Sequence, residues 1–335
     1  MFVALDTNSW FSERLLRSGL GATLLFALRQ RDARLILPRV VRLEAVAQLT
    51  EDGVKAVATI EKSLRTVASL LGRRPDPELP TADTIRNAID GRFDELAEFI
   101  DQLDPSIEDY SRAIERVIAK RPPNGRDEQF RDSLILEQLL RHFEGAEGFL
   151  VTNDGDFFAA KGSRELAPLL KEELAAVGSR LRVVSSIEDV LTGLGQSALQ
   201  PPRAAILEAI SRDVLFTLHA HATQQGYEIG DSTNAAIEAY VTEHYDELFI
   251  SFEVTWLALR IPLADGSVLP ERTVIATGTA IFNLRSRSAS NMQISQVQVR
   301  SQAREVIHQN ATVYPGAITF GARTVPYRLR RQLDQ

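Results

Sequence analysis

Apolar runs of four or five residues alternate with longer amphipathic segments through the first 195 residues of the chain. The runs at 2–5, 34–37, 149–152 and 181–185 have the length and composition of buried strands. Between them, apolar residues recur with helical spacing, and the segments predicted to be helical are 12–29, 38–49, 53–71, 81–103, 107–119, 128–143 and 163–177. Strands that alternate with helices predict a central parallel sheet covered on both faces, which is a three-layer α/β/α domain.

The pattern changes after residues 193–202, a segment ending in Gln200-Pro201-Pro202 that we expect to link two domains. Beyond it, 203–225 and 233–247 have helical spacing, whereas 248–262, 273–284 and 292–300 alternate Thr, Val and Ile like strands. Ala264-Asp265-Gly266 supplies a turn between the first two strands. Consecutive strands with short connections predict an antiparallel sheet. We therefore expect one domain over residues 1–195 and an α+β domain over 203–335.

The amino-acid composition limits the classes of protein to which this chain can belong. Of the 335 residues, 44% are hydrophobic and 25% are charged, as in ordinary soluble globular proteins. The absence of cysteine excludes disulfides, thiol catalysis and thiolate metal sites, and it favours a cytoplasmic location. We expect no signal peptide and no membrane span, because no segment reaches the roughly 18 uninterrupted apolar residues that a span needs. The net charge of −7 argues mildly against a surface devoted to nucleic acid, but leaves a nuclease with local phosphate contacts open.

Four acidic residues lie where strand ends and helices would direct them into one pocket. Asp6 follows the run at 2–5, Asp154 follows the run at 149–152, and Glu44 and Asp132 lie on predicted helices. Carboxylate oxygens prefer hard divalent cations, so the pattern predicts a site for Mg²⁺ or Mn²⁺. Without a cation the four carboxylates would repel one another, and metal binding is the simplest reason to bring them together.

The sequence around these acids resembles the PIN domain family over roughly residues 1–190. The resemblance is carried by Asp6-Thr7-Asn8, by Glu44, by Phe130-Arg131-Asp132-Ser133 and by Thr152-Asn153-Asp154-Gly155-Asp156. It implies an α/β/α fold on a parallel sheet and a metal-dependent ribonuclease, as in most members studied, many of which are toxins or RNA-processing enzymes. It also implies a homodimer. One departure is the segment from 51 to 120, which is longer than in compact members.

The resemblance also assigns roles to individual residues. It makes Asp6, Glu44, Asp132 and Asp154 the catalytic, metal-holding acids, with Asp156 either an additional ligand or a residue that supports the ligands. Asn8, Thr152 and Asn153 would support them.

Structural readings of the same residues remain open. Asp6 has the position of an ordinary turn former, and Asp154 and Asp156 flank Gly155 as they would in an Asx turn. Arg131 is a candidate for contacting nucleic-acid phosphate, but a surface ion pair with Asp127 or Glu128 is favoured.

The predicted function is therefore a divalent-metal-dependent endonuclease that hydrolyses phosphodiester bonds. Single-stranded RNA is the substrate that the resemblance implies, and a toxin, defence or processing role with a regulatory protein partner would fit. The alternatives are a DNA-cleaving nuclease of the flap type and a non-catalytic module that binds nucleic acid. A zinc site is disfavoured because His219 and His221, two apart on a predicted helix, do not share a face.

The second domain carries an uneven distribution of charge. Residues 231–271 contain eight acids and one Arg, whereas 285–335 contain eight Arg and two acids. The basic end, with Arg328, Arg330 and Arg331, is a candidate for binding nucleic-acid phosphate or a partner. The alternative is that the acidic and basic stretches pair with each other on one folded surface.

Overall fold

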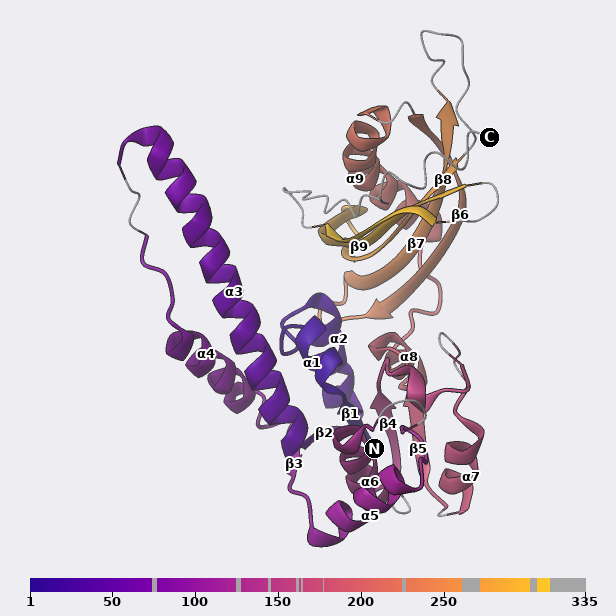
Figure 1. Ribbon diagram of the computed structural model, residues 1–335. Helices are drawn as coiled ribbons and strands as arrows, with labels where there is room; N and C mark the ends of the chain where they lie inside the picture. The colour runs from indigo at the N-terminus through magenta and orange to yellow at the C-terminus, as the bar shows by residue number, and fades with distance from the viewer. Residues whose placement is uncertain are drawn as a thin grey trace, which may run out of the picture. The chain divides into compact units, whose positions relative to one another are not determined.

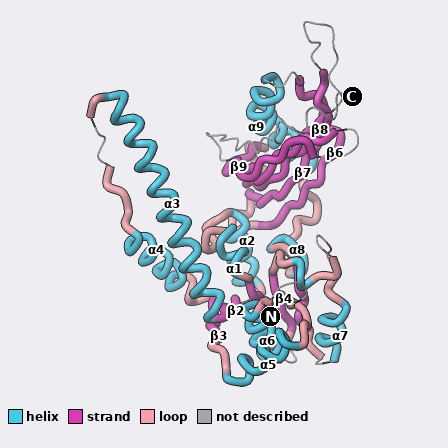
Figure 2. The backbone as a smooth tube through the Cα atoms, viewed as in Figure 1, coloured by secondary structure: helices cyan, strands magenta, loops and turns pink. Residues whose placement is uncertain are grey.

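The chain folds into two compact units, Met1–Gln196 and Ser197–Gln335. The structure, a computed structural model, describes residues 1–313 except 74–76, 125–127, 144–145, 161–162, 164, 177, 225–226, 261–271 and 302–305. Figures 1 and 2 show the helices and strands of both units. The boundary between the units falls inside the segment 193–202 that the sequence marks as a linker.

The first unit is built on a five-stranded parallel sheet in the order β3-β2-β1-β4-β5. Its strands are β1 (Phe2–Leu5), β2 (Arg34–Pro38), β3 (Ile100–Leu103), β4 (Glu147–Val151) and β5 (Arg180–Val184). Beyond the charged first residues of β2 and β4, the central strands are apolar because both faces of the sheet are covered, and Val3, Leu35 and Phe149 are at most 1% exposed. The predicted α/β/α architecture on a parallel sheet is confirmed.

Helices lie between these strands in the chain, as the crossover connections of a parallel sheet require. They are α1 (Thr7–Ser12), α2 (Gly19–Gln30), α3 (Arg39–Leu71), α4 (Ala82–Glu95), α5 (Ile107–Ile118), α6 (Phe130–His142), α7 (Pro168–Ala176) and α8 (Ile187–Gly193), with the 3-10 turn η1 (Gly155–Phe157). Helix α2 packs against α8, and α5 packs against α6. Only the first part of α3 is buried, at Val41, Ala45, Val46 and Leu49, and the rest of this long helix extends away from the sheet (Figure 1).

The single helix predicted over residues 12–29 is wrong, because the chain turns sharply between α1 and α2. Arg14, Leu15 and Leu16 all have the left-handed backbone conformation, with φ of 49°, 57° and 58°. For a residue other than glycine, this conformation costs about 1–2 kcal/mol of folding free energy. Burial of Leu15 and Leu16 helps to offset that cost. The Arg92 guanidinium of α4 donates hydrogen bonds to the carbonyls of Leu15 and Leu16 at 3.1 and 3.3 Å and fastens the turn.

Two further expectations for the first unit need correction. The predicted break between the helices 38–49 and 53–71 is absent, because Gly53 continues α3 and lies against Ile85 of α4. The helix predicted over 81–103 ends at Glu95, and Ile100–Leu103 forms the edge strand β3 beside β2. A four-residue edge strand with polar Asp101 and Gln102 has too little apolar pattern to distinguish it from the end of an amphipathic helix.

The second unit pairs helix α9 (Arg203–Gln224) with an antiparallel sheet in the order β10-β9-β8-β7-β6. The strands are β6 (Tyr227–Val241), β7 (Glu247–Arg260), β8 (Arg272–Asn283), β9 (Ser288–Ser301) and β10 (Val306–Val313). Its core joins α9 to one face of the sheet and includes Ile206, Ile210, Val214, Ile250, Val254 and Trp256. The predicted α+β fold with an antiparallel sheet is confirmed, but the helix expected at 233–247 is wrong because most of that segment forms β6.

None of the helices among the described residues combines the length and the apolar character needed to cross a membrane. The turn predicted at Ala264-Asp265-Gly266 lies outside the described residues, as do Arg323, Arg328, Arg330 and Arg331 of the basic end.

Candidate active site

Asp6 and Asp154 follow the carboxyl ends of two neighbouring strands at the centre of the parallel sheet. Asp6 comes directly after β1, and Asp154 comes three residues after the end of β4, which pairs with β1 along its length. The strand order reverses direction between β1 and β4, since β2 lies on one side of β1 and β4 on the other. Such a switch point leaves a crevice outside the carboxyl ends of the strands, where α/β proteins bind ligands.

Both of these aspartates also cap the short helical turn that follows them. Asp6 is 9% exposed, and its Oδ1 accepts a hydrogen bond of 2.7 Å from the backbone N–H of Ser9 at the start of α1. Asp154 caps η1, and its Oδ1 accepts a bond of 3.0 Å from the N–H of Asp156. The turn-forming role expected for an isolated acid is therefore present at each position. Each bond occupies one carboxylate oxygen, which fixes the direction of the side chain.

Glu44 reaches the same region from the first turns of α3 and is held by three neighbours. Its Oε2 accepts a hydrogen bond of 2.8 Å from the hydroxyl of Thr7, directly after Asp6, while its Oε1 accepts one of 3.2 Å from Gln48. Arg131 of α6 forms an ion pair with Glu44. The preference for Glu128 or Asp127 as the partner of Arg131 is therefore corrected to Glu44; Asp127 lies outside the described residues.

Asp132 lies in the first turn of α6, and the charges of the other three acids act on its carboxyl group. Burial and the negative charges of Asp154, Glu44 and Asp6 raise the pKa of Asp132 to about 6, and Arg131 opposes the rise only in part. Nearby like charges raise the pKa of a carboxyl group, and burial strengthens their effect. The charges of the three acids from other segments therefore act on Asp132, which places all four acids in one electrostatic neighbourhood.

The remaining predicted site residues lie around this group. Asp156 accepts a hydrogen bond of 3.0 Å from the side-chain amide of Gln129, and Thr152 is 2% exposed and accepts one of 3.1 Å from the N–H of Asp154. Asn8 and Asn153 are both exposed to solvent. The hydroxyl that contacts Glu44 belongs to Thr7, the residue next to the expected Asn8.

Sequence reasoning missed the residues that hold the start of α6. The side chain of Asn124 donates a bond of 2.7 Å to the hydroxyl of Ser133 and accepts one of 2.7 Å from the N–H of Gln129. Asn124 is 4% exposed, so these bonds hold the first turn of α6 from the inside of the unit. Its position within Pro122-Pro123-Asn124-Gly125 indicated a loop, and nothing in that sequence indicated that its amide would lie inward.

The chemistry of the donor set fits a hard divalent cation. Four carboxylates with no soft ligand among them are the groups that Mg²⁺ and Mn²⁺ prefer. Burial and the neighbouring acids raise the pKa of Asp132, and Arg131 offsets only part of this rise. Within the described residues, no three His, Cys, Asp or Glu side chains are arranged as a ready-made metal cluster. The hydrogen bonds to Asp6, Glu44 and Asp154 account for the present directions of those side chains.

Comparison with known proteins gives a family match over the part of the chain that contains these acids. A family model described as a PIN domain matches residues 3–157, which include all four acids and Asp156. No curated protein matches the chain. One similar solved structure is the crystal structure of VapBC2 from Rickettsia felis bound to a DNA fragment from their promoter. Its sequence identity is 12%, with 55% of this chain and 100% of that chain covered and a TM-score of 0.30, a likeness that carries no argument.

The family match covers less than half of the 335 residues, so it identifies the first unit of the chain. Strand order, the switch point and the acids after β1 and β4 are independent observations that point the same way. Residues 3–157 therefore belong to the PIN domain family, whose members are generally metal-dependent nucleases.

Proposed function

We propose that the protein is a divalent-metal-dependent endonuclease that hydrolyses phosphodiester bonds of single-stranded RNA. The observation that supports the proposal is that three carboxylates, Asp6 after β1, Glu44 of α3 and Asp154 after β4, act electrostatically on the largely buried carboxyl of Asp132 on α6. Acids whose negative charge is only partly balanced disfavour one another's ionisation. Groups with pKa values shifted in this way are common at functional sites. The lack of cysteine supports action in a reducing cytoplasm.

In this proposal Asp6, Asp132, Asp154 and Glu44 hold Mg²⁺ or Mn²⁺. A bound ion of this kind polarises the phosphate and lowers the pKa of an attacking water. The remaining contacts orient the acids: Thr7 holds one oxygen of Glu44, and the N–H of Asp156 holds one oxygen of Asp154. Because Gln129 already binds Asp156, we assign Asp156 a smaller role than Asp154.

Arg131 is the cation that the substrate would meet beside these acids. Its side chain is 65% exposed, and its ion pair with Glu44 keeps it next to the site. A guanidinium suits phosphate because it donates two parallel hydrogen bonds. We propose that Arg131 contacts the RNA backbone close to the cleaved bond.

The test is cleavage of a panel of single-stranded RNA, single-stranded DNA and flap DNA by wild type and Asp154→Asn, with Mg²⁺, Mn²⁺ or chelator. We expect RNA cleavage that requires metal and falls on the order of 1,000-fold or more in the variant, about 4 kcal/mol of transition-state stabilisation. Asp94→Asn, which removes a 79%-exposed carboxylate on α4, is the matched control and should retain activity. Full metal-dependent activity in Asp154→Asn would refute the site, and cleavage of DNA alone would replace RNA as the substrate.

A further inference from the structure

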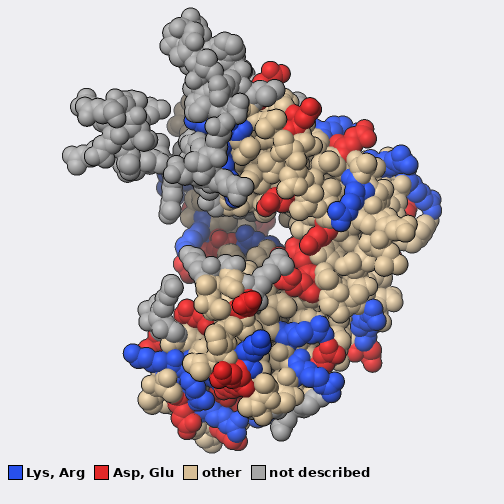
Figure 3. Space-filling view, turned by 90° about the vertical axis from the view of Figure 1, so that its right-hand side faces the viewer, with Lys and Arg blue, Asp and Glu red and all other residues tan. Residues whose placement is uncertain are grey.

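The outer part of helix α3 is rich in positive charge. The buried residues of α3 all lie before residue 50, and the rest of the helix extends away from the parallel sheet (Figure 1). Although the chain has a net charge of −7, residues 53–71 contain three cations, Lys55, Lys62 and Arg65, and one acid, Glu61. We call these three residues the α3 cations. On the face of the molecule shown in Figure 3, by contrast, cationic and anionic side chains are intermingled.

The α3 cations continue the side of the helix that carries Glu44 of the candidate active site. With about 3.6 residues in each turn, Lys55 and Lys62 lie within about 20° of Glu44 around the helix axis, and Arg65 within about 60°. Along the axis, Lys55 is about 16 Å from Glu44 and Arg65 about 31 Å. An extended molecule bound along this side therefore meets the acids of the site at one end and cations at the other.

The ion pairs of the α3 cations leave them open to a new partner. Lys55 pairs with Glu51 at 2.6 Å and Arg65 with Glu61 at 3.5 Å, and both cations are 70% exposed. Exposed pairs of this kind contribute little to stability, so a phosphate can replace the acid. Lys62 is exposed and has no ion-pair partner within the described part of the chain.

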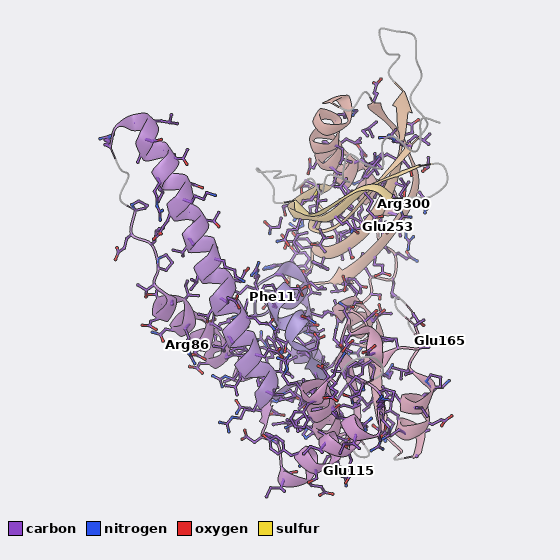
Figure 4. The ribbon with its side chains drawn as sticks, viewed as in Figure 1. Phe11, Arg86, Glu115, Glu165, Glu253 and Arg300 are labelled. Atoms are coloured by element: carbon purple, nitrogen blue, oxygen red, sulfur yellow. The ribbon has the colours of Figure 1, made fainter. Side chains whose placement is uncertain are left out.

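The acid that lies between Glu44 and Lys55 on this side of α3 is also neutralised. Asp52 forms an ion pair of 2.7 Å with Arg14, which follows α1. The guanidinium of Arg14 lies 5.1 Å from the ring centroid of Phe11, which is labelled in Figure 4. The negative charge of Asp52 is therefore offset by a cation of the neighbouring segment, and it opposes an anionic ligand only weakly.

The side chains between the α3 cations are short and neutral. The hydroxyls of Thr59 and Thr66 donate hydrogen bonds of 2.9 and 3.3 Å to backbone carbonyls of the preceding turn. The large apolar residues Ile60 and Leu64 lie on the opposite side of the helix, about 160° from Glu44. The side that carries the α3 cations therefore suits a chain of negative charges and offers no anchor to an apolar partner.

We infer that the α3 cations bind the phosphate backbone of single-stranded RNA and hold the strand that enters the candidate active site; this inference rests on the function proposed above. Basic tracks bind single strands through the backbone with little sequence preference. Continuity with Glu44 favours the substrate over a separate acidic protein, because one strand can contact both the site and the cations. At about 3.4 Å for each stacked nucleotide, the path from Glu44 to Arg65 accommodates on the order of ten nucleotides.

RNA binding in chelator tests the inference without any cleavage. Fluorescence anisotropy of the full chain with a labelled RNA of about 20 nucleotides measures affinity over a range of salt concentrations. In Lys55→Gln/Lys62→Gln/Arg65→Gln, the slope of log K against log salt should fall by about 2, at ~0.7 for each lost contact, and binding at about 0.1 M salt should weaken on the order of 100-fold.

The matched control is Lys171→Gln/Arg203→Gln/Arg212→Gln, which removes three exposed cations elsewhere and should bind as wild type does. Circular dichroism verifies that both triple variants are folded, as expected because glutamine is a good helix former. An unchanged affinity and slope in the α3 variant would overturn the inference and leave an acidic protein as the partner whose charge fits this surface.

The dependence of cleavage on RNA length separates this inference from the proposed function. An RNA of about four nucleotides is too short to reach from the site to Lys55, so wild type and the α3 variant should cleave it equally. On the longer RNA, the KM of the variant should rise at least tenfold with kcat unchanged. Equal losses on both RNAs would contradict the inference. If wild type cleaves neither RNA, the proposed function fails, while binding in chelator still decides whether the α3 cations hold RNA.

Discussion

Helix α6 has groups of buried charge at its two ends, and the two groups behave in opposite ways. At its start, burial and the charges of Asp154, Glu44 and Asp6 raise the pKa of Asp132 to about 6. Toward its end, Arg141 and Ser106 bind Asp109 and lower the pKa of that carboxyl, even though burial alone would raise it. One group is short of positive charge, and the other is balanced by arginine.

The difference separates a functional charge cluster from a structural one. The group around Asp109 and Arg116 satisfies its charges within the fold and holds α5, α6 and α7 together. In the group around Asp132, burial and the neighbouring carboxylates disfavour ionisation of Asp132, as expected where a cation belongs.

Removing the central cation of the structural group should have the largest effect on stability. Arg116→Met leaves Glu137 and Glu173 without their main partner, and we expect the free energy of unfolding to fall by about 3–5 kcal/mol. Urea denaturation followed by circular dichroism measures the change. Arg112→Met is the control on the same helix, since its pair with Glu108 is exposed and contributes roughly 0–1 kcal/mol. Equal effects of the two substitutions would show that the buried group is not structural.

Removing an acid from the functional group should instead raise the free energy of unfolding. The pKa of Asp132 is raised in the folded state, so its ionisation destabilises the fold at pH values above about 6. In chelator at pH 7.5, Asp132→Asn should therefore increase the free energy of unfolding by roughly 1–2 kcal/mol, while abolishing cleavage. A loss of stability in Asp132→Asn would mean that its charge is already compensated.

Low pH should reduce the contribution of the structural group to the free energy of unfolding, by a smaller amount. Because the pKa of Asp109 is lowered in the folded state, its pairing with Arg141 stabilises the fold fully above the unfolded-state pKa of about 3.9. That stabilisation is lost as the pH falls through the lowered value. The difference in unfolding free energy between wild type and Asp109→Asn should shrink between pH 5 and pH 2.5. A constant difference across this range would assign the effect of the substitution to packing.

The smallest effect concerns Arg131, a cation that pairs with Glu44 in the acidic group. Arg131 pairs with Glu44 and partly offsets the charge around Asp132, so it competes with a metal ion. We expect Arg131→Ala to bind Mn²⁺ about threefold more tightly, the range of an exposed ion pair, and to bind RNA with a weaker dependence on salt. Arg17→Ala, which removes an exposed arginine near α2, should change neither property. Unchanged metal affinity in Arg131→Ala would show that the pair with Glu44 does not compete.

The parts of the site that could be predicted are those fixed by a local rule. Asp6 and Asp154 follow apolar runs long enough to predict strands, and carboxyl ends of parallel strands meet at one edge of a sheet. The partner of Arg131 could not be predicted, since Glu44 lies 87 residues earlier and local candidates were nearer in sequence. The inward amide of Asn124 is likewise set by tertiary packing.

The fold was predictable to a similar extent. Strands made of uninterrupted apolar residues could be predicted from the sequence. Strand β6 could not, because it contains Asn234-Ala235-Ala236-Ile237-Glu238-Ala239, whose composition favours a helix. Pairing with β7 along its length overrides that preference. The left-handed residues Arg14, Leu15 and Leu16 carry no glycine or asparagine to signal the turn, which depends on contacts with Arg92 more than 70 residues away.

Direct titration of the full chain with Mn²⁺ by isothermal calorimetry tests the central claim, that these carboxylates form one cation site. Wild type should bind the ion, and Asp6→Asn, Asp132→Asn and Asp154→Asn should each weaken binding at least tenfold, or about 1.4 kcal/mol, while Asp94→Asn binds as wild type does. Binding of equal strength in all of these proteins, or no binding in wild type, would contradict the account.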